Sequence, residues 1–291
     1  MAQEDGNNAK RPKLIQVIGL GHSGTTLLDA VLGCSPKVVG IGEALRTLDH
    51  RIAPNSSTFR NLREGRFQEA VCSCGETVET CPVWRPLQPH LLGSAAPQSV
   101  AQNLDKLWHA ARDQNPSMEY LLESTPAGIG YSAELSAHFD LRLVFIVRDV
   151  RSWGASQARR RKVPMHRAYA KWLAQVPELQ RRIEASGLPC FRLGYEELAL
   201  APAKALGKLC DWLGIAYTDE MLTPGAFSGS HIANGNVAML KGDRTLSIRY
   251  DADWLTHGRL DVRALWLLRR AATINQELVY GNGVLQRPPK K

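Results

Sequence analysis

The stretch VIGLGHSGTTLLDAVLG, from Val17 to Gly33, determines the architecture, because a glycine loop here joins two segments of different periodicity. The run KLIQVIGL that ends in this loop is short and apolar, as in a buried parallel strand. After the loop, apolar residues recur at helical spacing as far as Gly33, a typical helix stop. A strand, a glycine loop and a helix in this order are typical of nucleotide-binding α/β proteins.

The glycines of this loop fit two nucleotide-binding patterns at once. Gly19, Gly21 and Gly24 form G-x-G-x-x-G, the dinucleotide fingerprint. Gly19 and Gly24 also have the spacing of the phosphate loop G-x-x-x-x-G-K-[ST]. The lysine position of that second pattern holds Thr25, and Thr26 follows it. The anion that such a loop binds must therefore be inferred from the rest of the chain.

The dinucleotide interpretation has one supporting residue. Glu43 lies 19 positions beyond Gly24, near the end of a second short strand, KVVGIGE. An acidic residue at about this distance binds a ribose hydroxyl in dinucleotide folds. A lone G-x-G-x-x-G is weak evidence, however, and such folds have no special need for the hydroxyls of Thr25 and Thr26.

The ATP or GTP interpretation lacks two groups. The loop lysine that reaches the β and γ phosphates is absent, and the strand LRLVFIV ends in Arg148 before Asp149. A cation thus stands where a metal-binding acid is expected. A phosphate that carries one sulfuryl group fits both absences, because it needs less compensating charge. Backbone N–H groups at the helix start and the hydroxyls of Ser23, Thr25 and Thr26 can bind this 5′-phosphosulfate.

Further along the chain, short apolar runs alternate with helical patterns. The runs EYLLES, LRLVFIVRD and LPCFRLGYEEL predict three more strands, and helices are expected at roughly 151–163, 166–186 and in APAKALGKLCDWLG. We therefore predict an α/β, P-loop-like three-layer fold with a mostly parallel central sheet. Residues 13–286 form one domain in this prediction, with a helical and loop-like insertion at 45–115 on the acceptor side and disordered tails at 1–12 and 287–291.

Composition places the chain among globular proteins: 291 residues, 44% hydrophobic and 22% charged. Its start is polar, and no apolar run approaches the roughly 18 residues of a membrane span. We expect a cytoplasmic protein. The net charge of +8 raises the possibility of nucleic-acid binding, but no nucleic-acid motif accompanies the basic run at 159–162. A small polyanionic ligand explains the charge equally well.

Three of the six cysteines form the pattern C-x-C-x6-C at Cys72, Cys74 and Cys81. These thiols can bind zinc, but a closed structural site needs four ligands. The fourth would have to come from elsewhere, such as Cys34 or His90. Buried, reduced thiols in a glycine-containing loop are the interpretation that the sequence favours, and we predict no metal for the reaction.

The motifs together resemble those of sulfotransferases that use 3′-phosphoadenosine 5′-phosphosulfate (PAPS). HSGTTLL resembles the phosphosulfate loop of that family, and VRDVRSWGAS resembles its 3′-phosphate motif. LGYEELALAPAKALGKLCDWLGI resembles a third stretch, and HIANGNVAMLKGD and IRYDADW resemble the nucleotide-covering C-terminal part of bacterial members. The resemblance covers most of the chain.

The resemblance implies roles for individual residues. Arg148 and Ser156 bind the 3′-phosphate, and Arg160 and Tyr195 contact the nucleotide. The phosphosulfate loop comprises Gly21, His22, Ser23, Gly24, Thr25, Thr26 and Leu27. In tyrosylprotein sulfotransferases and related bacterial enzymes, an acid at the position of Glu43 acts as general base.

The chain departs from the family pattern at three places. His22 stands where a loop lysine or arginine is usual, so we expect a protonated His22 to stabilise the leaving phosphate. The K-[TD]-P stretch of the family appears here as Ser124-Thr125-Pro126, without its lysine. The arginine that often follows Gly235-Asn236 is absent, and Lys241 and Arg244 come later. Of these late residues and His231, we assign only Lys241 to the nucleotide.

We therefore predict transfer of a sulfuryl group from PAPS to an acceptor hydroxyl or amine, with Glu43 as general base and no metal. The acceptor is a small molecule, a glycan or a lipid, and no specific nucleic-acid partner is expected. Two alternatives remain open: an NAD(P)-dependent oxidoreductase that uses the G-x-G-x-x-G pattern, and a non-catalytic nucleotide-binding module. The first gives Arg148 and Ser156 no role, and the second does not need Glu43.

Overall fold

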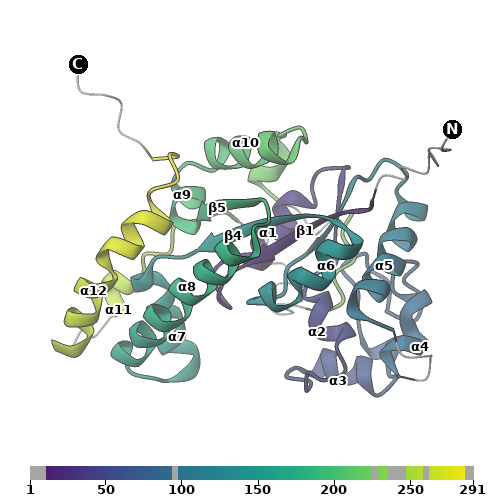
Figure 1. Cartoon of the computed structure of the whole chain (residues 1–291). Helices are drawn as coiled ribbons and strands as arrows, with labels where there is room; N and C mark the ends of the chain where they lie inside the picture. The colour runs from purple at the N-terminus through teal and green to yellow at the C-terminus, as the bar shows by residue number, and fades with distance from the viewer. Residues whose placement is uncertain (1–10, 94–97, 225–228, 235–246, 258–261, 286–291) are drawn as a thin grey trace, which may run out of the picture.

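A five-stranded parallel sheet forms the centre of the computed structural model (Figure 1). The structure describes residues 11–93, 98–224, 229–234, 247–257 and 262–285. The strand order is β2-β3-β1-β4-β5, and every neighbouring pair is parallel. The strands are β1 (Lys13–Ile18), β2 (Val38–Gly40), β3 (Tyr120–Glu123), β4 (Asp140–Val147) and β5 (Cys190–Gly194). All five coincide with the strands expected from the sequence.

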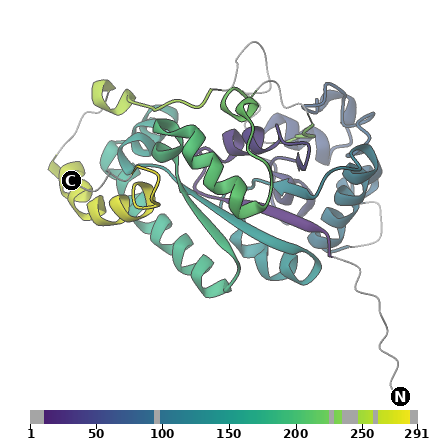
Figure 2. The same ribbon diagram turned by 90° about the horizontal axis from the view of Figure 1, so that it is seen from above.

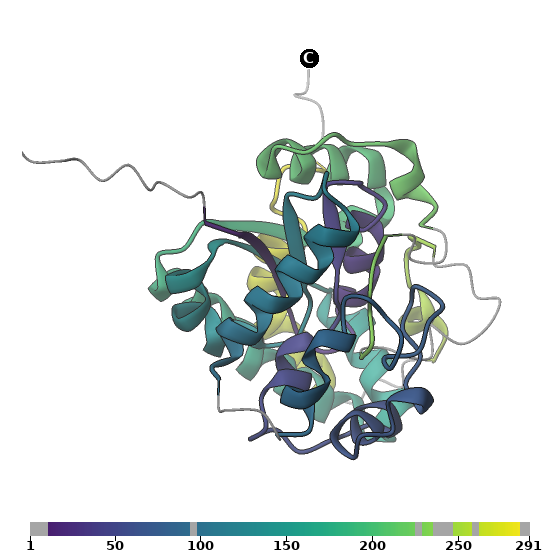
Figure 3. The same ribbon diagram turned by 90° about the vertical axis from the view of Figure 1, so that its right-hand side faces the viewer.

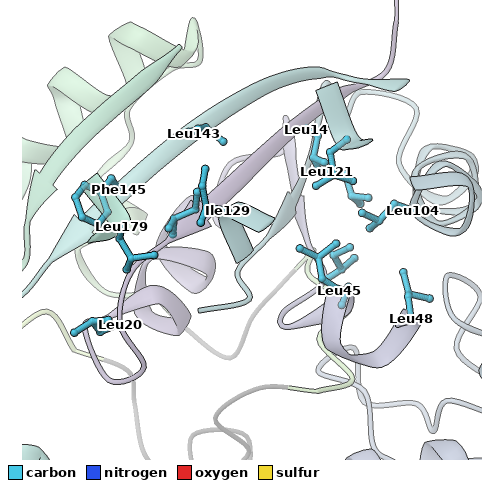
Figure 4. Close-up of a cluster of buried hydrophobic side chains, with 14 of the residues drawn as sticks. Leu14, Leu20, Leu45, Leu48, Leu104, Leu121, Ile129, Leu143, Phe145 and Leu179 are labelled. Atoms are coloured by element: carbon cyan, nitrogen blue, oxygen red, sulfur yellow. The ribbon is translucent and has the colours of Figure 1, made fainter. Parts of the chain in front are cut away.

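Alternate residues of the strands face two separate cores, as buried parallel strands require. On one face, Leu14 of β1 and Phe145 of β4 join a cluster with Leu104 of α5 (Val100–Gln114) and Leu179 of α8 (Met165–Ser186), part of which Figure 4 shows. On the other face, Ile15 packs with α1 (Thr25–Leu32) and α10 (Pro202–Leu213). Figure 2, seen from above, shows α10 lying over the strands. The predicted three-layer α/β architecture is confirmed.

The segment 45–115 contributes helices and no named strand to the described part of the chain. It contains α3 (Ser57–Arg63), α4 (Gln88–Leu91), α5 and most of α2 (Ala44–Leu48). These helices lie at the side of the molecule that faces the viewer in Figure 3. At the opposite side, α11 (Asp253–His257) and α12 (Val262–Val279) lie beside α7 (Val150–Arg161) and α8 (Figure 1). The sequence did not reveal α12, although α7, α8 and α10 start and end within two residues of their expected bounds.

Shorter elements complete the described chain. The helix α6 (Ser132–His138) precedes β4, and α9 (Tyr195–Leu200) follows β5 directly. Single turns of tighter helix occur at Phe67–Glu69, Arg85–Leu87, Gly128–Tyr131 and Asp219–Leu222. Among the described residues, no helix is both long and apolar enough to cross a membrane. Because all strands run in one direction, their carboxyl ends, and the loops that follow β1, β2 and β4, meet at one edge of the sheet.

Candidate active site

A cavity of about 1070 Å³ opens at the carboxyl edge of the sheet. Its wall combines the loop after β1, the start of α2, the helices α7 and α8, and the segment 247–253. Among the described residues, eight arginine or lysine side chains and four carboxylates line it, so this part of the wall carries an excess of positive charge. A cleft at this edge of a parallel sheet is the usual position of a ligand site in α/β proteins.

The glycine loop has a shape that only glycine at position 24 allows. Gly24 precedes α1 with a φ of 101°, in the left-handed region. A Cβ atom built there would lie 2.7 Å from Cδ2 of Tyr195, so neither the backbone nor the available space admits a side chain. The ring of Tyr195 therefore packs directly against the loop.

Bonds from the surrounding elements hold the loop in place. The indole N–H of Trp153 donates to the carbonyl of Gly21 at 2.9 Å, and Nη1 of Arg148 donates to the carbonyl of His22 at 3.0 Å. The backbone N–H of Ala127 donates to the carbonyl of Gly19 at 3.0 Å. The loop is thus held by α7, by Arg148 at the end of β4 and by the segment after β3.

Most of the loop residues predicted to bind phosphosulfate line the cavity. They are Gly21, His22, Gly24, Thr25, Thr26 and Leu27. Ser23 is buried and is not part of the wall that the described residues form. The start of α1 has no side-chain cap, and the N–H groups of a first helical turn lack partners within the helix. These N–H groups can therefore bind an anion at the loop.

His22 is neutral at pH 7 with the neighbours that the structure shows. Burial, followed by the charges of Arg160, Arg161 and Arg148, lowers the pKa of His22 to about 4. A protonated His22, as expected from the sequence, thus requires an anion close enough to offset both burial and these cations.

Arg148 leaves β4 at the edge of the cavity and is 8% exposed. Its Nη2 donates to Oδ2 of Asp251, and its guanidinium lies 5.0 Å from the centre of the Tyr195 ring. Ser156, which is predicted to bind the 3′-phosphate together with Arg148, lines the same cavity from α7. The structure therefore brings Arg148, Ser156 and Tyr195 together at one site, with a carboxylate bound to the arginine.

The end of α7 and the facing part of α8 form a basic wall. Arg160, predicted as a nucleotide contact, lines the cavity beside Arg159 and Arg161, and Lys171 and Arg182 line it from α8. Arg159 is engaged by Asp253, with 2.5 Å between Nη1 and Oδ2. Lys241, the last predicted nucleotide residue, lies outside the described residues, as do Asn236 and Arg244.

Glu43 stands directly before α2 and lines the cavity. Its Oε2 accepts a hydrogen bond of 2.9 Å from Nη1 of Arg46, and its backbone N–H donates to the carbonyl of Asn234 at 2.9 Å. Burial raises the pKa of Glu43, and Arg46 opposes the shift. Because its pKa is raised, this carboxylate is a stronger base than a free one. The side chain is 15% exposed, so it is still accessible from the cavity.

The acid that follows Arg148 is not available to a metal ion. Asp149 is completely buried. Its carboxylate accepts hydrogen bonds from Arg151 at 2.6 Å, Asn275 at 2.8 Å and Tyr280 at 2.7 Å, measured to Oδ2. The residue thus anchors α12 to the start of α7 and cannot serve as the metal-binding acid of an ATP or GTP site.

Outside this cavity, the three cysteines of the C-x-C-x6-C pattern lie together, and the residue that joins them is His231. Neither of the partners considered from the sequence does so. Cys34 bonds to the carbonyl of Ala30, and His90 contacts Lys106. His231 was missed as a partner because 150 residues separate it from Cys81 in the chain.

Several cavity residues have no sequence motif of their own. Arg46 lies one turn after Glu43, and Lys171 and Arg182 belong to a long amphipathic helix. Arg46 could have been found, because an arginine three positions after a glutamate on a helix lies on the same face. The others carry no signal that distinguishes them from solvated surface residues.

Comparison with known proteins identifies relatives of this arrangement. A model of the sulfotransferase family matches residues 12–219. The sulfotransferase domain from the curacin biosynthetic pathway is similar in structure, with a TM-score of 0.59, 18% identity, and coverage of 90% of this chain and 98% of that one. The sulfotransferase domain of the Synechococcus PCC 7002 olefin synthase gives a TM-score of 0.56, 18% identity, and coverage of 93% and 98%.

Proposed function

Because this chain belongs to the sulfotransferase family, we propose that it transfers a sulfuryl group from PAPS to an acceptor hydroxyl or amine. The observation that carries the proposal is the joint position of the loop, Arg148, Ser156 and Glu43 on the wall of one cavity. An anion-binding loop at one end, a cation for a second phosphate and a basic carboxylate are the three groups that this transfer requires.

In the proposed reaction, the phosphosulfate lies against the start of α1, and Arg148 and Ser156 bind the 3′-phosphate. Glu43 removes the proton of the acceptor as the acceptor oxygen or nitrogen attacks sulfur in line with the leaving phosphate. The S–O bond to the nucleotide breaks, and 3′,5′-bisphosphate leaves with the electron pair. The first-turn N–H groups and the basic wall of α7 and α8 offset the charge that develops on this product.

The acceptor site is proposed to involve the insertion at 45–115. Arg46, Asn55 and Ser56 of this segment line the cavity, and Arg46 hydrogen-bonds Glu43. Their guanidinium, amide and hydroxyl groups can hydrogen-bond a polar acceptor. We therefore propose a small-molecule, glycan or lipid acceptor that presents its nucleophile between Glu43 and the loop.

The oxidoreductase alternative is less consistent with the cavity. That alternative gives no role to Arg148 and Ser156, which share the cavity with the loop. A non-catalytic binding module would not need the raised pKa of Glu43.

The proposal predicts acceptor-dependent release of bisphosphate from PAPS, which chromatography of reactions with a panel of phenols, sugars and long-chain alcohols will detect.

The transfer should persist after brief treatment with EDTA, because the loop lysine is absent and Asp149 is buried among its own partners. Complete loss of turnover that Mg²⁺ restores would contradict the proposed mechanism. A loss of turnover that only Zn²⁺ restores would instead indicate that EDTA removes an ion from the cluster of Cys72, Cys74 and Cys81.

Nucleotide binding should depend on the protonation of His22. A phosphosulfate or phosphate beside this ring raises its pKa above the value of about 4 that burial and its cationic neighbours impose. The bound state then holds more protons between the two pKa values, so affinity increases as pH falls through that interval. Calorimetry of bisphosphate binding between about pH 7.5 and pH 5.5, in buffers of different ionisation enthalpy, measures this proton uptake.

His22→Asn is the matched control, because the phosphate groups of the ligand titrate over the same range in both proteins. The variant should take up fewer protons on binding than the wild type. Identical proton uptake in the two proteins would show that His22 stays neutral in the complex.

A further inference from the structure

The cysteine cluster is built by two segments that are far apart in the chain. Cys72, Cys74 and Cys81 lie between the single helical turns at Phe67–Glu69 and Arg85–Leu87, and His231 belongs to the short segment 229–234. Cys72 and Cys81 are buried, His231 is half-buried and Cys74 is exposed. None of these four residues lines the large cavity, so the cluster is separate from the proposed reaction site.

A tight turn presents the first two cysteines. The N–H of Gly75 donates to the carbonyl of Cys72 at 3.0 Å, and the N–H of Cys72 donates to the carbonyl of Glu76 at 2.8 Å. Gly75 has a φ of 93°, which glycine adopts without strain. The turn therefore brings the sulfurs of Cys72 and Cys74 to the same side of the chain as Cys81.

The distances from Sγ of Cys81 to the other three ligand atoms are close to those of a tetrahedral metal site. Sγ of Cys81 lies 3.7 Å from Sγ of Cys72 and 3.8 Å from Sγ of Cys74. Its distance to Nδ1 of His231 is 3.3 Å, and all four ligand atoms lie within 4.8 Å of one another. With Zn–S bonds of about 2.3 Å and Zn–N bonds of about 2.0 Å, a tetrahedron requires about 3.8 Å between sulfurs and about 3.5 Å between sulfur and nitrogen.

A disulfide or ordinary core packing accounts for the cluster less well than a metal ion does. A disulfide needs about 2.05 Å between two sulfurs, whereas Sγ of Cys81 lies 3.7 Å from Cys72 and 3.8 Å from Cys74. It would also leave the third thiol without a bonded partner. Ordinary core packing does not require an imidazole nitrogen to face a thiol at 3.3 Å. Three thiolates and one imidazole are a donor set that selects zinc, whereas oxygen ligands suit magnesium and calcium.

We propose that Cys72, Cys74, Cys81 and His231 bind one structural zinc ion. The four protein ligands complete the tetrahedron and leave no open position for a substrate. The three cysteines bind as thiolates, so the ion displaces their protons when it enters the site. The proposal does not depend on the identity of the reaction in the cavity.

The zinc ion would tie the cysteine segment to residues beside the cavity. Hydrogen bonds already join the two segments: Oγ of Ser73 donates to the carbonyl of Ser230 at 2.8 Å, and the N–H of Ser73 donates to the carbonyl of Ile232 at 3.0 Å. The indole N–H of Trp84 donates to the carbonyl of His231 at 2.6 Å, which fixes the backbone of this ligand. Coordination by His231 adds a strong bond to this connection.

The segment 229–234 in turn contacts the end of β2 and the start of α2. The N–H of His231 donates to the carbonyl of Gly40 at 2.7 Å, and the carbonyl of Asn234 accepts from the N–H of Glu43. Asn234 also lines the large cavity. The ion would therefore act as a positioning element for the backbone of Glu43 without contact to the substrate.

Metal analysis of the purified full-length protein tests the proposal. We expect one zinc ion per chain in protein prepared without added chelator, and loss of that ion in Cys74→Ser and in His231→Ala. Cys34→Ser and His90→Ala are matched controls, since each removes a possible ligand that lies outside the cluster, and both should retain zinc. Zinc content unchanged in Cys74→Ser and His231→Ala would overturn the proposal.

A second measurement on the wild-type protein keeps the proposal testable if these variants do not fold. An organomercurial that modifies the thiols should release zinc, which a colorimetric chelator detects. Reconstitution with Co²⁺ should give the visible absorption of a tetrahedral, thiolate-bound ion. A purified protein without zinc, which neither takes up Zn²⁺ nor gives this Co²⁺ spectrum, would contradict the proposal, as would a disulfide found by mass spectrometry within the cluster.

Discussion

Replacement of Glu43 by glutamine should lower kcat by about 10²- to 10⁴-fold, the usual contribution of a general base. An acceptor hydroxyl is a poor nucleophile at neutral pH, and Glu43 is the cavity carboxylate whose pKa is raised by burial. Glutamine keeps the size of the side chain and can still accept a hydrogen bond from Arg46. The affinity for the bisphosphate product, measured by calorimetry, should change by no more than about threefold, because Glu43 is assigned to the acceptor.

Two further variants separate this role from a general loss of charge. Glu178→Gln is the matched control, since Glu178 also lines the cavity but is exposed and paired with Arg181, and it should retain turnover. Arg46→Ala removes the cation that lowers the pKa of Glu43. Because the base must be ionised, the acidic limb of the kcat/KM profile should move to higher pH in this variant. Near-normal turnover in Glu43→Gln would show that the base lies elsewhere.

Replacement of Arg148 by alanine should weaken the binding of adenosine 3′,5′-bisphosphate by about tenfold to hundredfold. This range corresponds to the roughly 1.5–3 kcal/mol that a hydrogen bond to a charged group contributes. Arg148 is almost completely buried, lies beside Tyr195 and shares the cavity with Ser156. Affinity for adenosine 5′-phosphate, which lacks the 3′-phosphate, should hardly change when measured under the same conditions.

Asp251 provides a matched test in the opposite direction. Its carboxylate accepts a hydrogen bond from Nη2 of Arg148, so a 3′-phosphate has to compete with it. Asp251→Asn should therefore bind the bisphosphate more tightly than the wild type, with no gain for adenosine 5′-phosphate. Equal losses of both ligands in Arg148→Ala would indicate that this arginine only holds the carbonyl of His22 and does not recognise the 3′-phosphate.

The sheet and its loop were predictable because their signals are local. The run from Val17 to Gly33 carries a strand, a φ-positive glycine and a helix within a few residues, and each is recognisable from its own side chains. The four other strands are short apolar runs with clear boundaries. The helix α12 was not predicted because only part of it is buried. Leu265 and Trp266 are apolar but exposed, so they obscure its amphipathic pattern.

The site was predictable only where a motif carried it. Arg148, Ser156 and Glu43 were found through spacing and resemblance, and the structure places them on one cavity. The pairing of Arg148 with Asp251 and the meeting of Cys81 with His231 depend on tertiary contacts between distant segments. The low pKa of His22 likewise arises from burial and then from charges that include Arg160 and Arg161 of α7, which no local pattern connects with the loop.

Calorimetric titration of the protein with adenosine 3′,5′-bisphosphate, ATP and NAD in parallel tests the central claim, that the cavity binds PAPS, most directly. The loop at Gly24 and the Arg148–Ser156 pair predict that the bisphosphate binds the most tightly of the three, without added metal ion. Tight binding of NAD with none of the bisphosphate would contradict this account and favour the dinucleotide interpretation of the glycine loop.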